Sequence, residues 1–574
     1  MQRRPLAAAA AAAVALATAL VVPATTAGPA AAAPAAAAGA TRYVVLGAET
    51  ATRAAALAAI TRAGGRVVAE NKSIAAYTVE AGAGFATAAA GQSALAGAVP
   101  DRVIGRAPGG PARVDPNAEP AAARAARAKL GRAAKAGPKA TTAEPLSGLQ
   151  WDMRMIKADQ ANKTNKGSRK VKVGIIDSGI DASNPDLAPN VDLDLSRNFV
   201  TDIPSVDGPC EFAGCVDPVG HDDSGHGTHV AGTVAAAVNG TGIAGVAPGV
   251  TLVEVRAGQD FGYLFLNPVL SALTYSADVG LDVVNMSFYV DPWLFNCTAN
   301  PADSPAEQAE QRTIIRAMTR AMNYAHRKNV TMVVSLGNDH QDLGAPLPDL
   351  GSPDYPEDAA HPRTIDNSDC LVFPIEGPHA IGVSALGPSG RKADYSNYGT
   401  EQITVSAPGG WFRDGLGTPS YRTDANEILS TYPLNVLQAA GQVDADGNVV
   451  AGFENSVFKS CTAAGACGYY AYLQGTSMAA PHATGVAALI VSRYGKHDPA
   501  HPAQLTLAPD RVERILTASA AKVACPASGG ETYVPEGRSP EFDATCTGTL
   551  DFNGFYGHGI VDALAVVSGP FGNA

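Results

Sequence analysis

The sequence predicts an α/β fold in which helices cover both faces of a parallel sheet, preceded by a small α+β module. Beyond Trp151, apolar runs rich in branched residues alternate with helical segments, which is typical of parallel strands joined by crossover helices. The 574 residues are 46% hydrophobic and 17% charged, a composition that allows a large core and excludes a mainly disordered chain. Residues 1–146 hold 16 Lys and Arg against 7 Asp and Glu, a net of +9, so the remainder of this −12 chain carries −21. The first quarter is therefore a separate unit.

Residues 1–27 have the form of a secretory signal peptide. Arg3 and Arg4 precede the apolar run Leu6 to Val22, and small residues follow around Ala24 to Ala27. A membrane anchor is the competing interpretation, but this Ala-rich run is shorter than the roughly 20 residues that a span needs. No later run is long enough either. We therefore expect a secreted, extracellular protein without a membrane partner after signal removal, with residues 28–41 as an Ala- and Pro-rich spacer.

The small α+β module is predicted over residues 42–104, and a basic linker over residues 105–146. In the linker, Glu119 to Lys139 holds six basic residues and one acidic residue, which indicates an exposed, protease-accessible connection. A polyanion-binding arm is the alternative, although the acidic chain as a whole argues against a nucleic-acid partner. The elements expected in the module are strands at Tyr43 to Leu46, Arg66 to Ala69 and Ile74 to Val79, and a helix at Thr52 to Ala63 that ends at Gly64-Gly65.

Residues 147–574 are predicted to form one large domain. Catalytic groups in such a fold gather at the carboxyl ends of the parallel strands. The expected strands are Val171 to Ile176, Val250 to Val255, Val283 to Met286 and Val330 to Ser335, and the expected helices are Ser271 to Val279, Gln308 to Arg327 and Ser477 to Tyr494.

Eight cysteines, all beyond residue 209, favour disulfides in an exported protein. A zinc site is the weaker alternative because no Cys-x-x-Cys pair occurs. Eight cysteines allow 105 connectivities, so spacing alone leaves the pattern open. Pairing neighbours in the sequence gives Cys210–Cys215, Cys461–Cys467 and Cys525–Cys546, and leaves Cys297 with Cys370.

Three motifs place an Asp, a His and a Ser at separate strand–helix junctions. Asp177 follows a buried strand, His226 begins a helix-like run, and Ser477 stands at a helix N-terminus. An alcohol nucleophile needs a base to take its proton, and an imidazole base needs a carboxylate to fix its tautomer. A metal pair formed by His226 and His229 is the competing interpretation, but the interposed Glu of H-E-x-x-H is absent.

These motifs resemble the active-site signatures of the subtilisin-like serine protease family. They read Asp177-Ser178-Gly179-Ile180-Asp181, His226-Gly227-Thr228-His229-Val230-Ala231-Gly232-Thr233 and Gly475-Thr476-Ser477-Met478-Ala479-Ala480-Pro481-His482. The resemblance implies a subtilisin-like catalytic domain and a serine endopeptidase that cleaves polypeptides through an acyl-enzyme on Ser477. It makes Asp177 the orienting acid, His226 the base, Asn338 the oxyanion donor and His229 a structural residue. A catalytically silent binding protein on the same fold is the alternative, and an esterase is disfavoured by the order of the triad.

The resemblance also implies partners and a metal. Residues 42–104 would be an inhibitor-type propeptide, docked by opposite charge and removed by cleavage in the linker. The chemistry would need no cofactor, but a structural calcium would involve Asp186 and Asn239. The family's N-terminal Gln ligand has no clear counterpart, since Ser147 occupies its approximate place. An ordinary surface turn is the other interpretation of Asp186 and Asn239. The mature enzyme is expected to be a monomer.

The expected specificity departs from the family pattern. Tyr289 stands where the family has a glycine beside the P1 side chain, which predicts a narrowed or reshaped pocket. The tracts Asp291 to Glu310, Asp339 to Ile375 and Gly410 to Gln474 are longer than a minimal member needs. We expect them to form disulfide-stapled loops around the cleft; surface loops far from it are the alternative.

Overall fold

The computed structural model of the chain describes residues 41–101 and 144–571. The expected signal peptide and spacer, and most of the linker, lie outside these residues. Across both described stretches, no helix combines the length and the apolar character that a membrane span requires.

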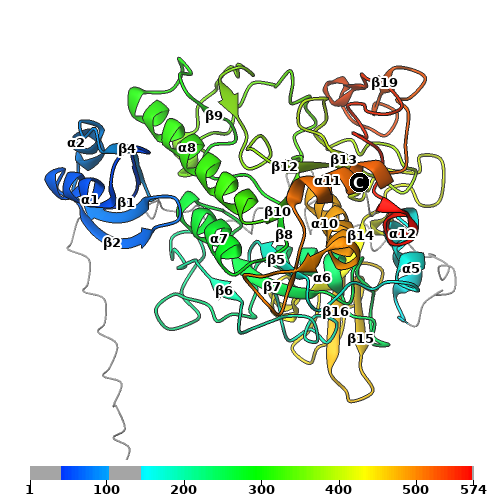
Figure 1. Ribbon diagram of the computed structural model, residues 1–574. Helices are drawn as coiled ribbons and strands as arrows, with labels where there is room; N and C mark the ends of the chain where they lie inside the picture. The colour runs from blue at the N-terminus through cyan, green and yellow to red at the C-terminus, as the bar shows by residue number, and fades with distance from the viewer. Residues whose placement is uncertain (1–40, 102–143, 572–574) are drawn as a thin grey trace, which may run out of the picture. The chain divides into compact units, whose positions relative to one another are not determined.

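A seven-stranded parallel sheet is the centre of the large domain, in the order β13-β12-β10-β8-β5-β7-β6 (Figure 1). The central strands are buried runs of branched residues, as parallel strands covered on both faces must be. The α/β fold predicted from the sequence is confirmed. The strands are β5 (Lys172–Ile176), β6 (Arg197–Asn198), β7 (Thr251–Arg256), β8 (Val283–Met286), β10 (Thr331–Ser335), β12 (Ala380–Leu386) and β13 (Val405–Pro408).

Helices pack on both faces of this sheet because successive strand residues point to opposite sides. In β5, Val173 and Ile175 belong to one core with α6 and α10, whereas Ile176 belongs to a second core with α7 and α8. The ribbon shows α7 and α8 side by side (Figure 1). The helices of the large domain are α4 (Trp151–Met155), α5 (Ala158–Ala161), α6 (His226–Ala235), α7 (Leu266–Asp278), α8 (Pro305–Arg327), α9 (Leu434–Ala439), α10 (Thr476–Tyr494), α11 (Pro509–Ser519) and α12 (Ala563–Ser568).

The N-terminal module is an antiparallel sheet in the order β2-β3-β1-β4 with two helices. One face has its own small core, and the other contributes Val44, Leu46 and Val99 to the core of α7 and α8. Arg316 and Arg320 of α8 donate to the carbonyls of Ala96 and Gly47 at 2.6 and 2.8 Å. The module therefore docks on α7 and α8. Its elements are β1 (Thr41–Gly47), α1 (Arg53–Arg62), β2 (Arg66–Asn71), β3 (Ala76–Ala81), α2 (Phe85–Ala90) and β4 (Leu95–Pro100).

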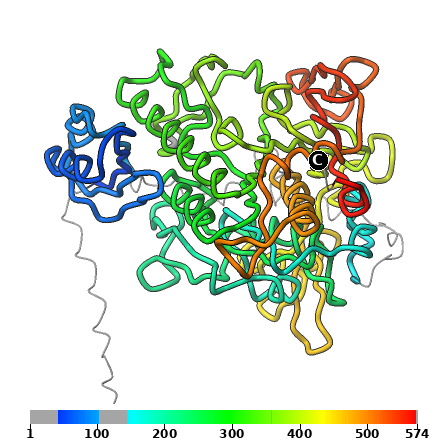
Figure 2. The backbone as a smooth tube through the Cα atoms, viewed as in Figure 1, coloured from blue at the N-terminus to red at the C-terminus, as the bar shows by residue number. Residues whose placement is uncertain are grey.

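A second, antiparallel sheet runs beside α6 and contains the hairpin of β15 and β16, which the tube trace shows as a projecting loop (Figure 2). Its strands are β14 (Ile428–Tyr432), β15 (Val457–Cys461) and β16 (Cys467–Leu473). Short pairs complete the strands: β9 (Asn296–Cys297) with β11 (Cys370–Leu371), β17 (Lys496–His497) with β18 (Leu505–Thr506), and β19 (Gly530–Glu531) with β20 (Ala544–Thr545). The 3₁₀ turns are Ser147–Leu149, Glu357–Ala359, Asp424–Asn426 and Pro540–Phe542.

Four disulfides join the eight cysteines, in the pairs Cys210–Cys215, Cys297–Cys370, Cys461–Cys467 and Cys525–Cys546. These are the pairs that neighbour spacing favours. The Cys297–Cys370 bridge links β9 to β11 and closes a loop of 73 residues, whereas Cys461–Cys467 spans 6.

Removing Cys297–Cys370 should destabilise the protein more than removing Cys461–Cys467. By the loop-closure relation, the double Ala variants should lose about 4 and about 2 kcal/mol respectively. Thermal unfolding of both variants under non-reducing conditions tests this, each serving as the control for the other. Equal losses would contradict an origin in loop length.

Candidate active site

Asp177 and His226 are in contact at the carboxyl end of β5. Asp177 is the first residue after β5, and His226 is the first residue of α6. Nδ1 of His226 lies 2.8 Å from Oδ1 of Asp177, which also accepts the N–H of Ser178 at 2.8 Å. The Asp177 side chain is 4% exposed and the His226 side chain 33%, so a buried carboxylate holds a ring that still reaches the surface. This arrangement favours the tautomer with its proton on Nδ1.

Asp222 ties the end of β5 to the start of α6. Its carboxylate accepts the Ser178 hydroxyl at 3.0 Å, the N–H of Gly225 at 2.9 Å, and both the N–H and the hydroxyl of Thr228 at 3.0 and 2.6 Å. A negative charge at a helix N-terminus also interacts favourably with the helix dipole. Sequence reasoning assigned Asp222 no role, and its only signal was an acid shortly before the first turn of a helix.

The junction also requires a glycine after His226. A Cβ on Gly227 would lie 2.2 Å from the carbonyl oxygen of Gly179 and 3.1 Å from Cβ of Asp177. Real Cβ atoms do not approach an oxygen so closely, so any side chain here would push α6 away from the end of β5. The Gly in the His-Gly-Thr-His motif therefore sets the Asp177–His226 distance.

Ser477 is the second residue of α10 and lies at the end of β8. Its hydroxyl donates to the carbonyl of Ser287 at 3.3 Å, and the Ser287 hydroxyl donates to the Ser477 carbonyl at 3.1 Å. Ser287 directly follows β8, which neighbours β5 in the sheet. Ser477 and Asp177 therefore lie at the same end of the sheet, where the parallel strands have their carboxyl ends.

Asn338 lies just beyond β10 with its amide orientation set by Thr476. Oδ1 of Asn338 accepts both the N–H and the hydroxyl of Thr476 at 2.9 Å, which leaves Nδ2 directed as a donor. Nδ2 of Asn338 and the N–H nitrogen of Ser477 each lie 3.6 Å from the position that a Cβ on Gly475 would take. Two donors thus border one small space beside Ser477.

His229 is part of the scaffold. It is fully buried, and its Nε2 lies 3.0 and 3.2 Å from the carbonyls of Ile428 and Ala471. Burial lowers the pKa of His229 to about 3, so the ring stays neutral and joins α6 to β14 and β16.

Asp186 and Asn239 lie together, but their surroundings do not fit calcium. Oδ2 of the buried Asp186 accepts the Ile243 N–H and the Tyr470 hydroxyl, both at 2.9 Å, and burial raises the pKa of Asp186 to about 7. Oδ1 of Asn239 accepts the Thr241 N–H at 2.9 Å. Calcium is held by six to eight oxygen ligands, whereas here N–H donors occupy Oδ2 of Asp186 and Oδ1 of Asn239, and of these two side chains only Oδ1 of Asp186 is buried without a hydrogen bond.

Tyr289 and Asp354 flank the site. Tyr289 is two residues beyond Ser287, and its hydroxyl donates to Oδ2 of Asp354 at 2.7 Å. The N–H of Asp354 donates to the Pro292 carbonyl at 2.9 Å. The segment that leaves β8 is therefore bonded to the later tract around Asp354 at a point two residues beyond Ser287, which contacts Ser477.

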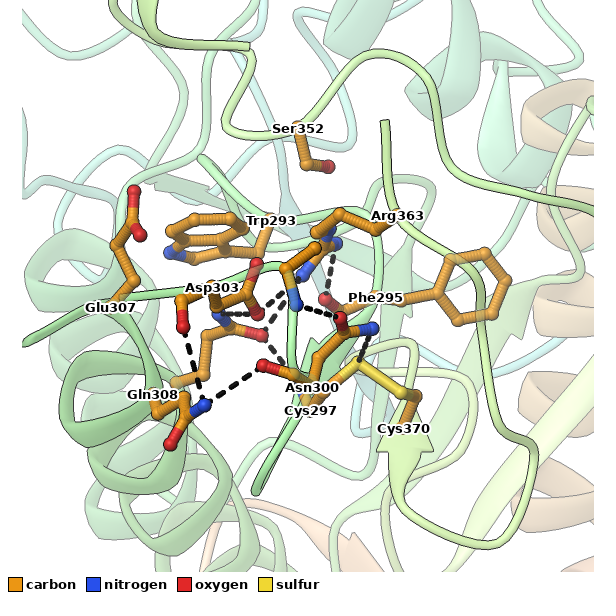
Figure 3. Close-up of polar contacts among 12 residues, drawn as sticks. Trp293, Phe295, Cys297, Asn300, Asp303, Glu307, Gln308, Ser352, Arg363 and Cys370 are labelled. Atoms are coloured by element: carbon orange, nitrogen blue, oxygen red, sulfur yellow. Dashed lines mark hydrogen bonds and ion pairs between the residues drawn. A yellow bond between two sulfur atoms is a disulfide. The ribbon is translucent and has the colours of Figure 1, made fainter. Parts of the chain in front are cut away.

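A buried arginine joins the same two tracts (Figure 3). The Arg363 guanidinium is fully buried and pairs with Asp303 and Asp349. It also donates to the Phe295 carbonyl at 2.8 Å and lies 4.7 Å from the Trp293 ring centroid. With the Cys297–Cys370 disulfide, Arg363 holds the tracts 291–310 and 339–375 together.

Replacing Asp222 by Asn should destabilise the junction of β5 and α6. Asn keeps the shape but loses the charge and turns an NH₂ group toward backbone N–H donors, so we expect a loss of about 2–4 kcal/mol. Thermal unfolding measures it, with the exposed Asp446→Asn as the matched control. An unfolding temperature equal to that of the control would refute this role of Asp222.

Comparison with known proteins identifies the family. The model of the subtilase family matches residues 168–559. Subtilisin DY of Bacillus licheniformis is 28% identical over 346 residues, covering 60% of this chain and 85% of that protein. Thermitase of Thermoactinomyces vulgaris is 27% identical over 349 residues, covering 61% and 84%.

Solved structures share the fold. The epidermin leader peptide processing serine protease of Staphylococcus aureus superposes with a TM-score of 0.59 at 20% identity, covering 92% of this chain and 98% of that one. Fervidolysin of Fervidobacterium pennivorans gives 0.53 at 22% identity, covering 93% and 61%. With a family match over most of its length, this chain belongs to the subtilase family and is a subtilisin-like serine endopeptidase.

Proposed function

We propose that this endopeptidase is secreted and hydrolyses peptide bonds through an acyl-enzyme on Ser477, with His226 as base and Asp177 as the orienting acid. The observation that carries this proposal is the 2.8 Å contact between Nδ1 of His226 and Oδ1 of Asp177. Because this contact places the proton on Nδ1, Nε2 of His226 is the basic nitrogen, at the carboxyl ends of the strands where Ser477 also lies.

In the proposed reaction, Nε2 of His226 takes the proton from the Ser477 hydroxyl as the oxygen attacks the substrate carbonyl carbon. The buried Asp177 carboxylate stabilises the imidazolium that forms. The imidazolium then gives its proton to the leaving amine, and the C–N bond breaks. Water repeats the sequence with the acyl-enzyme, releasing the acid and restoring the Ser477 hydroxyl.

The developing oxyanion would be held by Nδ2 of Asn338 and the N–H of Ser477. Thr476 supports this role because it occupies Oδ1 of Asn338 and so orients the amide nitrogen before substrate arrives. A donor fixed in advance needs no reorganisation as the charge forms, which is the source of its catalytic effect.

The module of β1 to β4 would act as the propeptide of this enzyme. Its docking on α7 and α8 supports this, because Val44, Leu46 and Val99 enter the same core as both helices. Asn71 and Asp101 add contacts to Thr274 at 2.7 Å and Asn267 at 3.1 Å. The mature enzyme would act on polypeptides as a monomer.

Covalent labelling tests the nucleophile. A fluorophosphonate should label the wild type and not Ser477→Ala, because the reagent needs an activated hydroxyl. The exposed Ser183→Ala is the matched control and should label like the wild type. A wild type that stays unlabelled while folded would instead indicate a silent binding protein.

Asn338→Ala should lower kcat about 100- to 1,000-fold with a much smaller change in KM, since the lost hydrogen bond forms mainly in the transition state. Steady-state peptide hydrolysis measures both constants, and the exposed Asn448→Ala should leave them unchanged. A change confined to KM would contradict an oxyanion role.

A further inference from the structure

Glu144 is a fully buried carboxylate at the start of the large domain. The N–H of Gly240 donates to both of its oxygens, at 3.0 and 3.1 Å. A buried charge is tolerated only when such donors replace its water.

The loop 239–243 is shaped to present these donors. Gly240 and Gly242 have φ angles of 84° and 57°, in the left-handed region that favours glycine. Such turns direct successive backbone N–H groups into one concave surface, which binds anions. The next N–H along, that of Ile243, donates to Asp186, so the loop holds two carboxylates.

This geometry opposes a cation at Glu144. A cation bound by both oxygens of a carboxylate lies on the line that bisects them, where the Gly240 N–H lies here. The amide hydrogen and a cation repel one another and cannot share that position.

The chain after Glu144 is anchored to the same loop. The Leu146 N–H donates to the Gly242 carbonyl at 2.7 Å, and the Ser147 hydroxyl donates to the Glu144 carbonyl at 2.7 Å. Leu146 and Leu149 pack against the cluster that contains Ile243 and Tyr470. Glu144 is thus the first described residue of a segment built into the large domain.

We propose that the loop 239–243 is a carboxylate-binding site whose ligand is Glu144 of the same chain, in the place of a structural calcium ion. The mature endopeptidase then keeps Glu144 as its N-terminal anchor, and maturation cleaves the chain before this residue. The second statement rests on the proposed self-processing, whereas the first does not.

The thermal test uses the full chain carrying Ser477→Ala, so that autolysis does not interfere. Adding Glu144→Gln should lower the unfolding temperature by on the order of 3–5 °C, by the same amount in calcium and in EDTA. Glu144→Asp keeps the charge, so its unfolding temperature should fall less. The unfolding temperature of the exposed Glu454→Gln variant should not change. A calcium-dependent stabilisation that Glu144→Gln abolishes would overturn the proposal, as would no shift at all.

The maturation test is N-terminal sequencing of the secreted wild type. The mature chain should begin at or before residue 144, and a chain that begins after it would overturn the anchor. Failure of the proposed function would appear separately, as a folded wild type that fluorophosphonate does not label, and the thermal result would still stand.

Discussion

The parallel register of three neighbouring strands is the constraint on which the site depends. Ile176 of β5 and Val334 of β10 both pair with Met286 of β8, so the three strands end in one row. Asp177 and Ser287 each follow that row by one residue. Because neighbouring strands lie about 4.8 Å apart, this register alone brings the acid close to the segment that contacts Ser477.

At the carboxyl ends of these strands, close contact between backbone segments fixes the positions of the site residues. The absence of a side chain at Gly227 lets α6 begin against the end of β5, and Asp222 then bonds to both segments. On the other side, Thr476 orients Asn338 while the next residue presents its hydroxyl. The bonds that Asp222 makes to both segments are buried, where competition from water is small.

Elements with a clear local hydrophobic pattern could be predicted from the sequence, and elements that depend on distant pairing could not. β5, β8 and β10 are short, almost fully buried strands rich in branched residues, so their prediction is straightforward. β12 contains Gly382 and Ser384 and was missed, because its pairing depends on β10 and β13 rather than on propensity. α8 begins before the expected Gln308 because Ser304 and Glu307 form a capping box, a signal that was present in the sequence.

The residues of the site also fall into those that the sequence predicts and those that it does not. Asp177, His226 and Ser477 stand in motifs that are contiguous in sequence, whereas the roles of Asp222 and Glu144 arise from bonds between distant segments. No local pattern marks Glu144, since an acid after a basic linker is ordinarily exposed.

Glu144 and Arg363 show two ways in which this fold buries charge. Arg363 is balanced by two aspartates, so removing one partner would leave an uncompensated charge among loops that carry Asp354. Glu144 has only backbone donors, which no side-chain substitution elsewhere can remove. The first arrangement ties the insertions to one another. The second ties the start of the domain to its own scaffold through the backbone of the loop 239–243, so the position of the N-terminal segment depends on the fold of that loop.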